Sequence, residues 1–161
     1  MQPGDKEAGV EALTLALGFQ ATRLADDSMR LNPANMANLV RLTMGGIHLG
    51  NRTLVLHARL RYFDPESRRP GLPADVAALV ERMTEDRTVV TLVNVSQVHR
   101  RKVIVQAGSY GEHEFTTATA GEKTLKVNGR HLEVTLEPGA GTRLELGTKR
   151  YSHPPTLAWP W

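Results

Sequence analysis

Residues 88–117 read TVVTLVNVSQVHRRKVIVQAGSYGEHEFTT, and this stretch decides the predicted fold. Two runs rich in β-branched residues, 88–95 and 102–106, flank the polar connector SQVHRR. Val or Ile at nearly every position predicts strands with little exposure on either face. The second run continues into a glycine-bearing turn, 107–111, and then into the ionisable segment EHEF.

Short strands continue through the rest of the C-terminal half. They are predicted at 88–95, 101–107, 112–118, 124–127, 131–136 and 142–147. Among the turn signals between them, Asn128-Gly129 is the strongest for a hairpin, because a type I′ turn needs a positive φ at both central residues. Short strands joined by hairpins predict an antiparallel β-sandwich or small barrel over about 88–151.

The N-terminal half is predicted to be mostly helical. Apolar residues at helical spacing predict a helix over 9–24, and Asn32-Pro33 begins a second helix that Gly45-Gly46 ends. The alternating run TLVLHARLRYF, 53–63, predicts one half-buried strand. A further helix is predicted to begin at Pro73 and to end near Met83, with an apolar stripe formed by Val76, Leu79, Val80 and Met83.

The predicted fold class is therefore α+β. Residues 1–87 form a helical segment with one strand and a linker, and this segment packs against an antiparallel β-sandwich. Residues 88–161 comprise that sandwich and a tail rich in proline and tryptophan.

Composition limits the functions that the chain can have. It carries 20 basic and 17 acidic side chains, for a net charge of +3, and no cysteine. The missing cysteine excludes disulfides, cysteine-based zinc sites and a thiol nucleophile. No apolar run approaches the ~18 residues of a membrane helix, and MQPGDKEAG lacks the basic-then-apolar order of a signal peptide. We therefore expect no membrane partner, and the compartment stays open.

The turn 107–111, AGSYG, is one substitution away from the G-x-S-x-G nucleophile elbow and follows a predicted strand. The elbow requires a helix after its serine, whereas the next residues, EHEFTT, alternate as in a strand. We interpret the segment as a glycine-bearing hairpin turn, and no pair of carboxylates can be assigned as acid and base. The sequence therefore predicts no catalytic residue.

His113-Glu114 begins like H-E-x-x-H but lacks the second histidine and lies in a strand-like segment. Alternation places Glu112 and Glu114 on one face and His113 on the other, so they do not converge on one ion without a bulge. We expect no metal, no other cofactor and a solvated strand face. Tyr110, Glu112 and His113 are the candidate site if the chain is a small stand-alone enzyme or a ligand-binding protein.

Two basic clusters could contact anions. His57, Arg59 and Arg61 share one face of the predicted strand 53–63 and could bind a carboxylate, a phosphate or an acidic sugar. The alternative is a solvated outer face. The connector His99–Lys102 is also basic, but it has no aromatic neighbours for base stacking, so we expect no nucleic-acid partner.

The tail 152–161, SHPPTLAWPW, contains both tryptophans and three prolines, so it is not predicted to form regular structure. We expect it to lie across the sandwich. If Trp159 and Trp161 are exposed, they can stack on sugar rings; if they are buried, they clasp the fold.

The segments VTLVNVSQVHRRKVIVQAGSYGEHEF, 90–115, and VNGRHLEVTLEPGAGTRLELGTKRY, 127–151, carry a resemblance. They combine a valine-rich strand ending in Asn94, a strand running into a glycine turn, and a Leu-rich hairpin closing near Pro138-Gly139. In these features residues 88–151 resemble the C-terminal β-sandwich of large bacterial glycosidase-like proteins, whose α/α-barrel catalytic region comes first. The resemblance implies a packing domain behind a catalytic domain of a longer polypeptide, and it places no catalytic residue here.

Three hypotheses of function follow. The first is a non-catalytic accessory or C-terminal domain of a carbohydrate-active protein, with an interface and a glycan contact. The second is a stand-alone enzyme or ligand-binding protein that uses Tyr110, Glu112 and His113. The third is a homo-oligomeric structural protein that associates through its strand edges.

Overall fold

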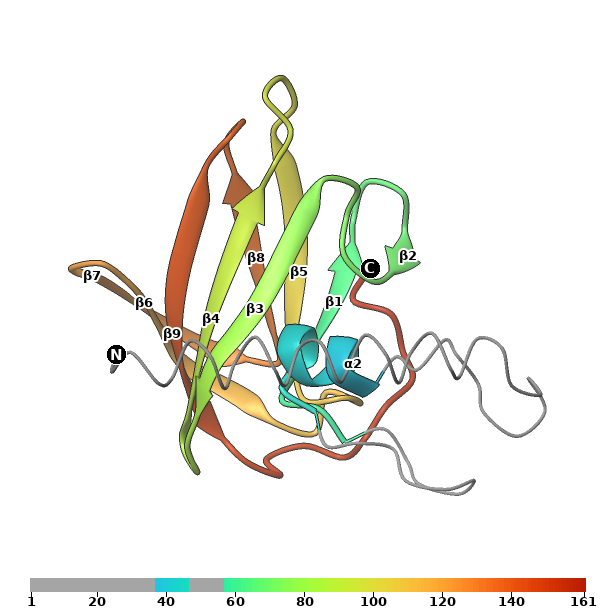
Figure 1. The fold of residues 1–161 in the computed structure, drawn as a ribbon. Helices are drawn as coiled ribbons and strands as arrows, with labels where there is room; N and C mark the ends of the chain where they lie inside the picture. The colour runs from blue at the N-terminus through green and yellow to red at the C-terminus, as the bar shows by residue number, and fades with distance from the viewer. Residues whose placement is uncertain (1–36, 47–56) are drawn as a thin grey trace, which may run out of the picture. The chain divides into compact units, whose positions relative to one another are not determined.

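The strands pair into two antiparallel sheets in the computed structural model, which describes residues 37–46 and 57–161 (Figure 1). The first sheet has the order β2–β1–β5–β8 and consists of β1 (Leu60–Asp64), β2 (Arg69–Pro70), β5 (Arg101–Ala107) and β8 (His131–Leu136). The second has the order β3–β4–β9–β6–β7 and consists of β3 (Val76–Met83), β4 (Arg87–Asn94), β6 (Glu114–Ala120), β7 (Lys123–Gly129) and β9 (Gly141–Lys149). The described part is thus mostly β-structure, with one short helix, α2 (Ala37–Met44).

The strands predicted in the C-terminal half are all present. Those predicted at 101–107 and 131–136 match β5 and β8 at both ends. The prediction that the central runs are buried on both faces is confirmed for β5, where all residues from Val103 to Ala107 are buried. The regular pattern of apolar residues was therefore sufficient to place these strands.

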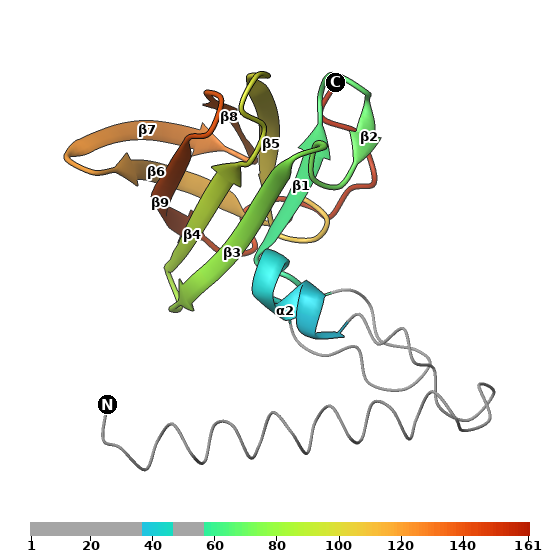
Figure 2. The same cartoon turned by 45° about the horizontal axis from the view of Figure 1, so that its top comes forward.

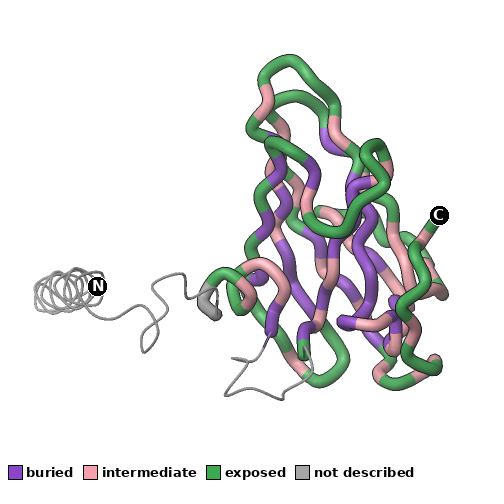
Figure 3. The backbone as a smooth tube through the Cα atoms, turned by 90° about the vertical axis from the view of Figure 1, so that its right-hand side faces the viewer, coloured by how far each residue is buried: buried purple, intermediate pink, exposed green. Residues whose placement is uncertain are grey.

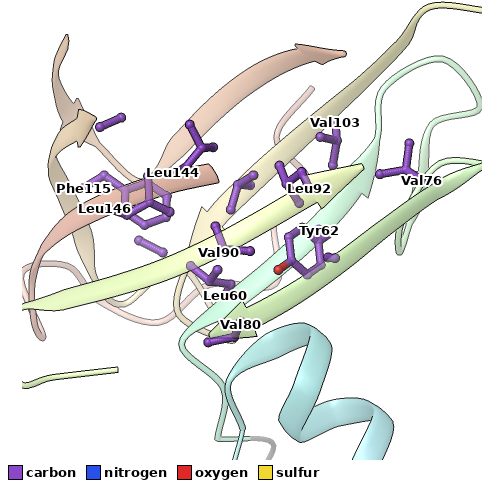
Figure 4. Packing of buried hydrophobic residues seen from close by; sticks show 14 of the residues in the cluster. Leu60, Tyr62, Val76, Val80, Val90, Leu92, Val103, Phe115, Leu144 and Leu146 are labelled. Atoms are coloured by element: carbon purple, nitrogen blue, oxygen red, sulfur yellow. The ribbon is translucent and has the colours of Figure 1, made fainter. Parts of the chain in front are cut away.

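One hydrophobic core joins the two sheets. Alternate side chains of the first sheet, such as Leu60, Val103 and Leu136, belong to the same buried cluster as Val90 and Leu146 of the second. Figure 4 shows Leu60, Val103, Val90 and Leu146 of this cluster packed between the ribbons. Figure 3 shows that buried positions follow the strands while most connecting loops are exposed. Two antiparallel sheets around one core agree with a β-sandwich-like fold.

The helix predicted from Pro73 to Met83 is wrong, because this segment contains strand β3. Val76, Ala78 and Val80 are buried and alternate with exposed residues, which is the period of a strand. Asp75 has a φ of 61°, which no right-handed helix accommodates. A short apolar run fitted both periods, and antiparallel pairing with β4 decides between them.

The hairpin predicted at Asn128-Gly129 is also wrong. Asn128 has a positive φ of 49°, but Gly129 ends β7 and pairs with Phe115 of β6. The next strand, β8, pairs with β5 in the other sheet. The chain therefore changes sheets after Gly129, and β8 does not pair with β7.

Asn94 fixes another change of sheet, between β4 and β5. Its side chain is fully buried, and its Nδ2 donates to the carbonyl oxygens of His99 at 2.7 Å and Glu137 at 3.1 Å. Its Oδ1 accepts a hydrogen bond from the backbone N–H of Ser96. The predicted connector SQVHRR is thus a bridge between the sheets, tied to the end of β4.

Helix α2 lies beside the ends of β1 and β3, as both ribbon views show (Figures 1 and 2). The prediction that glycine ends this helix is confirmed, since Gly45 has a φ of 62° and its N–H donates to the Arg41 carbonyl. The Tyr62 hydroxyl donates to the Thr43 carbonyl and so links the helix to the core. No helix in the described part of the chain has the length and apolar character needed to cross a membrane.

The predicted start at Asn32-Pro33 and the predicted helix over 9–24 lie outside the described residues. The described elements belong to a compact unit, Ala37–Trp161, and the predicted domain boundary between residues 87 and 88 falls inside it. The strand predicted over 53–63 is described only from residue 57, and its regular part is β1.

Candidate functional site

The C-terminal tail crosses the outer face of the first sheet and places its tryptophans on Phe63. Leu60 and Tyr62 of β1 point into the core, so Phe63 points away from it. Phe63 is nevertheless only 1% exposed. The end of the tail lies beside β1 and β2 in both ribbon views (Figures 1 and 2).

Four rings form what we call the aromatic surface: Phe63, His131, Trp159 and Trp161. The indoles of Trp159 and Trp161 stack on each other, with centroids 5.6 Å apart and planes 12° apart. Both indoles stand nearly perpendicular to the Phe63 ring, at centroid distances of 6.0 and 5.9 Å. These are the edge-to-face and stacked arrangements that aromatic pairs prefer.

The tryptophans are both anchored and accessible. Trp159 is 49% exposed and Trp161 is 44% exposed, although each contacts Phe63. The two alternatives for the tail, a clasp on the fold and an exposed aromatic surface, therefore hold together. The indoles cover a buried ring and keep about half of their own surface open to solvent. Arg61 lies at the edge of this surface, with its guanidinium carbon 5.1 Å from the centre of the Phe63 ring.

A buried amide supports the aromatic surface from β5. The Gln106 Nε2 group donates to the carbonyl oxygens of Gly108 and Ser109, so its Oε1 is left as an acceptor for His131 Nε2 at 3.0 Å. The His131 ring therefore carries its proton on Nε2. Burial, and then the charge of Arg130, lowers the pKa of His131, which favours the neutral ring that packs on Phe63.

The segment 107–111 is a structural turn, but the hairpin predicted there is wrong, because the turn joins β5 of the first sheet to β6 of the second. Ser109 is fully buried, and its hydroxyl accepts a hydrogen bond from the Ala58 N–H at 2.8 Å. Glu112 folds back over the turn and accepts a hydrogen bond from the Tyr110 N–H at 2.7 Å. The carbonyls of Tyr110 and Glu112 accept hydrogen bonds from Thr156 and His153 of the tail.

His113 lies before β6 and is 2% exposed, so the expected solvated strand face is wrong at this position. Its Nδ1 accepts a hydrogen bond from the Tyr151 N–H at 3.1 Å, and its Nε2 lies 3.8 Å from Glu112 Oε1. The Tyr151 ring packs edge-on against the imidazole. Tyr110, Glu112 and His113 therefore form one cluster, and the contacts of this cluster link the turn to the start of the tail.

The basic row predicted on the strand 53–63 does not act as one surface. His57 is exposed, whereas Arg59 donates to the Thr84 carbonyl at 3.0 Å and Arg61 donates to the Ser109 carbonyl at 3.1 Å. Burial, and then the charge of Arg150, lowers the pKa of Arg59. Only Arg61 lies against the aromatic surface.

We expect the stability of the protein to fall as the pH drops below about 6.5, because the unfolded chain then binds a proton at His113 that the folded protein disfavours. Burial lowers the pKa of His113 against the opposing attraction of Glu112, and Arg59 and Arg150 also disfavour the cation. The neutral ring therefore stabilises the fold fully above the ordinary pKa of 6.5, and this contribution is lost as the pH falls through the lowered pKa.

Urea unfolding at pH 7 and pH 5 measures this dependence for the native protein and for His113→Asn, which retains an acceptor near Nδ1 but does not titrate. The variant should lose less stability between the two pH values than the native protein. His57→Asn, at an exposed histidine, is the matched control and should behave like the native protein. The pH dependence of stability that remains in His113→Asn should come from His131, whose pKa is also lowered. If His113→Asn lost as much stability as the native protein between the two pH values, the assignment to His113 would be contradicted.

Sequence reasoning missed Phe63, Gln106 and His131 as partners of the tail. Phe63 gave a usable signal, since it was the one aromatic residue on the predicted outer face of its strand. Among the described residues, no cluster of three or more His, Asp or Glu side chains is arranged to bind a metal ion. Comparisons with protein families, curated proteins and solved structures found no match for this chain.

Proposed function

We propose that this chain is a non-catalytic accessory domain with a β-sandwich fold, which packs within a carbohydrate-active protein and contacts glycans through Trp159 and Trp161. The observation that carries the proposal is the stacked indole pair, fixed on Phe63 and about half exposed. Rigid aromatic rings with an open face bind the apolar face of a sugar ring at a low cost in conformational entropy.

The size of the exposed surface sets the expected affinity. An indole that is about half open can bury roughly 100 Å² more, which is worth about 2.5 kcal/mol per ring at most. Lost translational and side-chain freedom offsets much of this gain. We therefore expect weak binding, with a Kd on the order of 0.1–10 mM.

Polar groups beside the rings suit a hydroxylated ligand. Arg61 lies against Phe63, and its Nη1 is already bonded to the Ser109 carbonyl, so the guanidinium is fixed in place. Lys102 and Glu133 point outward from the neighbouring strands β5 and β8 and form an exposed ion pair at 3.0 Å. Such groups donate to and accept from sugar hydroxyls next to an apolar platform.

A stand-alone enzyme centred on Tyr110, Glu112 and His113 is the alternative proposal, and the geometry supports it less. A general acid or base needs a side chain within hydrogen-bond reach of its substrate. His113 and the Glu112 carboxylate instead bond to the backbone of the chain itself, and His113 is almost fully buried.

We expect Trp159→Ala and Trp161→Ala each to weaken oligosaccharide binding about tenfold or more, as for central aromatic residues of binding surfaces. Titration calorimetry with neutral hexasaccharides of glucose, mannose and xylose measures the affinity, and melting curves check that each variant is folded. Leu157→Ala is the matched control, because Leu157 lies in the same tail and is 76% exposed. An equal loss in Leu157→Ala, or no binding of any hexasaccharide to the native protein, would contradict the proposal.

A further inference from the structure

A polar recess lies on the outer face of the five-stranded sheet. Its volume is about 250 Å³. It is lined by Asp86, Arg87, Thr116, Thr117, Thr119, Glu145, Gly147 and Thr148. Phe63 and the tryptophans belong to the other sheet and the tail, so this recess is separate from the aromatic surface.

The register of the strands explains the recess. Gly147 of β9 pairs with Arg87 of β4 on one side and with Thr117 of β6 on the other. These positions form a row across the sheet, and the middle one has no side chain. In the next row, Glu145 lies between Val89 and Thr119, so a carboxylate borders the gap.

A β-bulge brings two hydroxyls to the same point. The register shifts between Phe115 and Thr117, which leaves Thr116 as the extra residue of β6. A Cβ at position 147 would lie 2.5 Å from the Thr117 hydroxyl and 2.7 Å from the Thr116 hydroxyl. Glycine is therefore required at position 147, because a Cβ there would collide with both hydroxyls. A glycine within a strand often marks such a close approach.

These hydroxyls are available to a ligand. Neither the Thr116 nor the Thr117 hydroxyl makes a hydrogen bond to any residue that the structure describes. By contrast, the Thr119 hydroxyl already bonds to that of Thr124, and the Thr148 hydroxyl bonds to the Leu146 carbonyl. Two free hydroxyls side by side can each donate and accept.

The charges around the recess select a neutral ligand. Arg87 and Glu145 form an ion pair with each other, and Asp86 accepts a hydrogen bond from the Thr84 hydroxyl at 3.0 Å. An anion would meet the carboxylates of Asp86 and Glu145, and a metal cation would meet the guanidinium of Arg87. A neutral molecule with several hydroxyls can instead donate to the carboxylates and accept from the threonines and Arg87.

We propose that this recess is a second binding site, which takes one ring of a neutral saccharide or a similar polyol. The volume is slightly below the roughly 300 Å³ at which pockets for drug-sized ligands begin, which suits a single ring. Because the site uses other residues on the other sheet, it does not depend on binding at Trp159 and Trp161.

The test is a titration of the ¹⁵N-labelled full chain with cellotriose, a neutral trisaccharide, followed by ¹H–¹⁵N spectra. The backbone amides of Thr117, Thr119 and Gly147 should shift on titration. They should still shift in the double variant Trp159→Ala/Trp161→Ala, which separates this site from the aromatic surface. The titration of this double variant therefore tests the recess separately from the aromatic surface, so that either proposed site can be contradicted without the other.

The double variant Thr116→Val/Thr117→Val removes both hydroxyls but keeps β-branched side chains suited to a strand. It should weaken binding at the recess about tenfold or more, because two hydrogen bonds are lost. Thr135→Val, on the exposed face of β8 in the other sheet, is the matched control and should change nothing.

Three results would overturn the proposal. The first is that these amides do not move at concentrations that would fill a millimolar site. The second is equal weakening by the Thr135→Val control. The third is that sodium sulfate, used as an anionic probe, produces the same shifts as the saccharide, since this would make the recess an anion site.

Discussion

Removing residues 152–161 is expected to lower the free energy of unfolding by about 2–3 kcal/mol and the Tm by about 5–10 °C. The tail covers Phe63, whose side chain is 1% exposed although it points away from the core. Re-exposing a phenylalanine costs about 1.5–3 kcal/mol. The deletion also removes the hydrogen bonds from His153 N–H to the Glu112 carbonyl, at 3.3 Å, and from Thr156 N–H to the Tyr110 carbonyl, at 2.8 Å.

The released tail regains conformational entropy, which offsets part of this loss. A shorter deletion, 158–161, separates the two contributions, because it removes both indoles but keeps the hydrogen bonds of His153 and Thr156. It should cause an intermediate loss of stability in thermal and urea unfolding. If the longer deletion melted at the same temperature as the native protein, the tail would be an appendage that does not stabilise the fold.

The second large effect is expected at Gly108, where alanine should destabilise the protein by about 2–3 kcal/mol. Gly108 has a φ of 88°, and a Cβ there would lie 2.5 Å from the Glu112 carboxylate. That carboxylate would have to move and would lose its hydrogen bond to the Tyr110 N–H. The carbonyls of Tyr110 and Glu112, which accept hydrogen bonds from Thr156 and His153 of the tail, would then change position.

Gly121→Ala is a matched control for this prediction. Gly121, in the β6–β7 turn, also has a positive φ, 57°, but a Cβ there would have no neighbour within 4 Å. It should cost only about 1 kcal/mol, from the backbone conformation alone. Equal losses in the two variants, measured by urea unfolding, would show that the Glu112 contact does not matter.

The strands could be predicted from the sequence because β-branched residues, alternation and turn residues agreed with one another between residues 88 and 149. The segment 73–83 could not, because Val76 and Val80, four residues apart, fit a helical stripe as well as the buried face of a strand. Pairing with β4 is a tertiary interaction that local spacing does not contain. The same applies to Asn128-Gly129, where β7 pairs with β6, the strand before it, while β8 pairs with the more distant β5 in the other sheet.

The candidate site could be predicted only in part. The two tryptophans drew attention as large aromatic residues in a proline-rich tail, but nothing local indicated that they would contact Phe63. The polar recess was not predictable either, since it depends on a bulge at Thr116 and on its register with Gly147. Both sites arise from contacts between segments that are distant in sequence.

The most direct test of the glycan contact uses the two indole N–H signals of the protein, since the chain has two tryptophans. A ¹H–¹⁵N spectrum resolves these signals away from the backbone amides, and neutral hexasaccharides of glucose, mannose and xylose are added stepwise. We predict that both indole signals shift together and saturate with at least one of these ligands, because the rings are stacked on each other and on Phe63. Indole signals that stay unmoved by all three would contradict the proposal that this domain contacts glycans through Trp159 and Trp161.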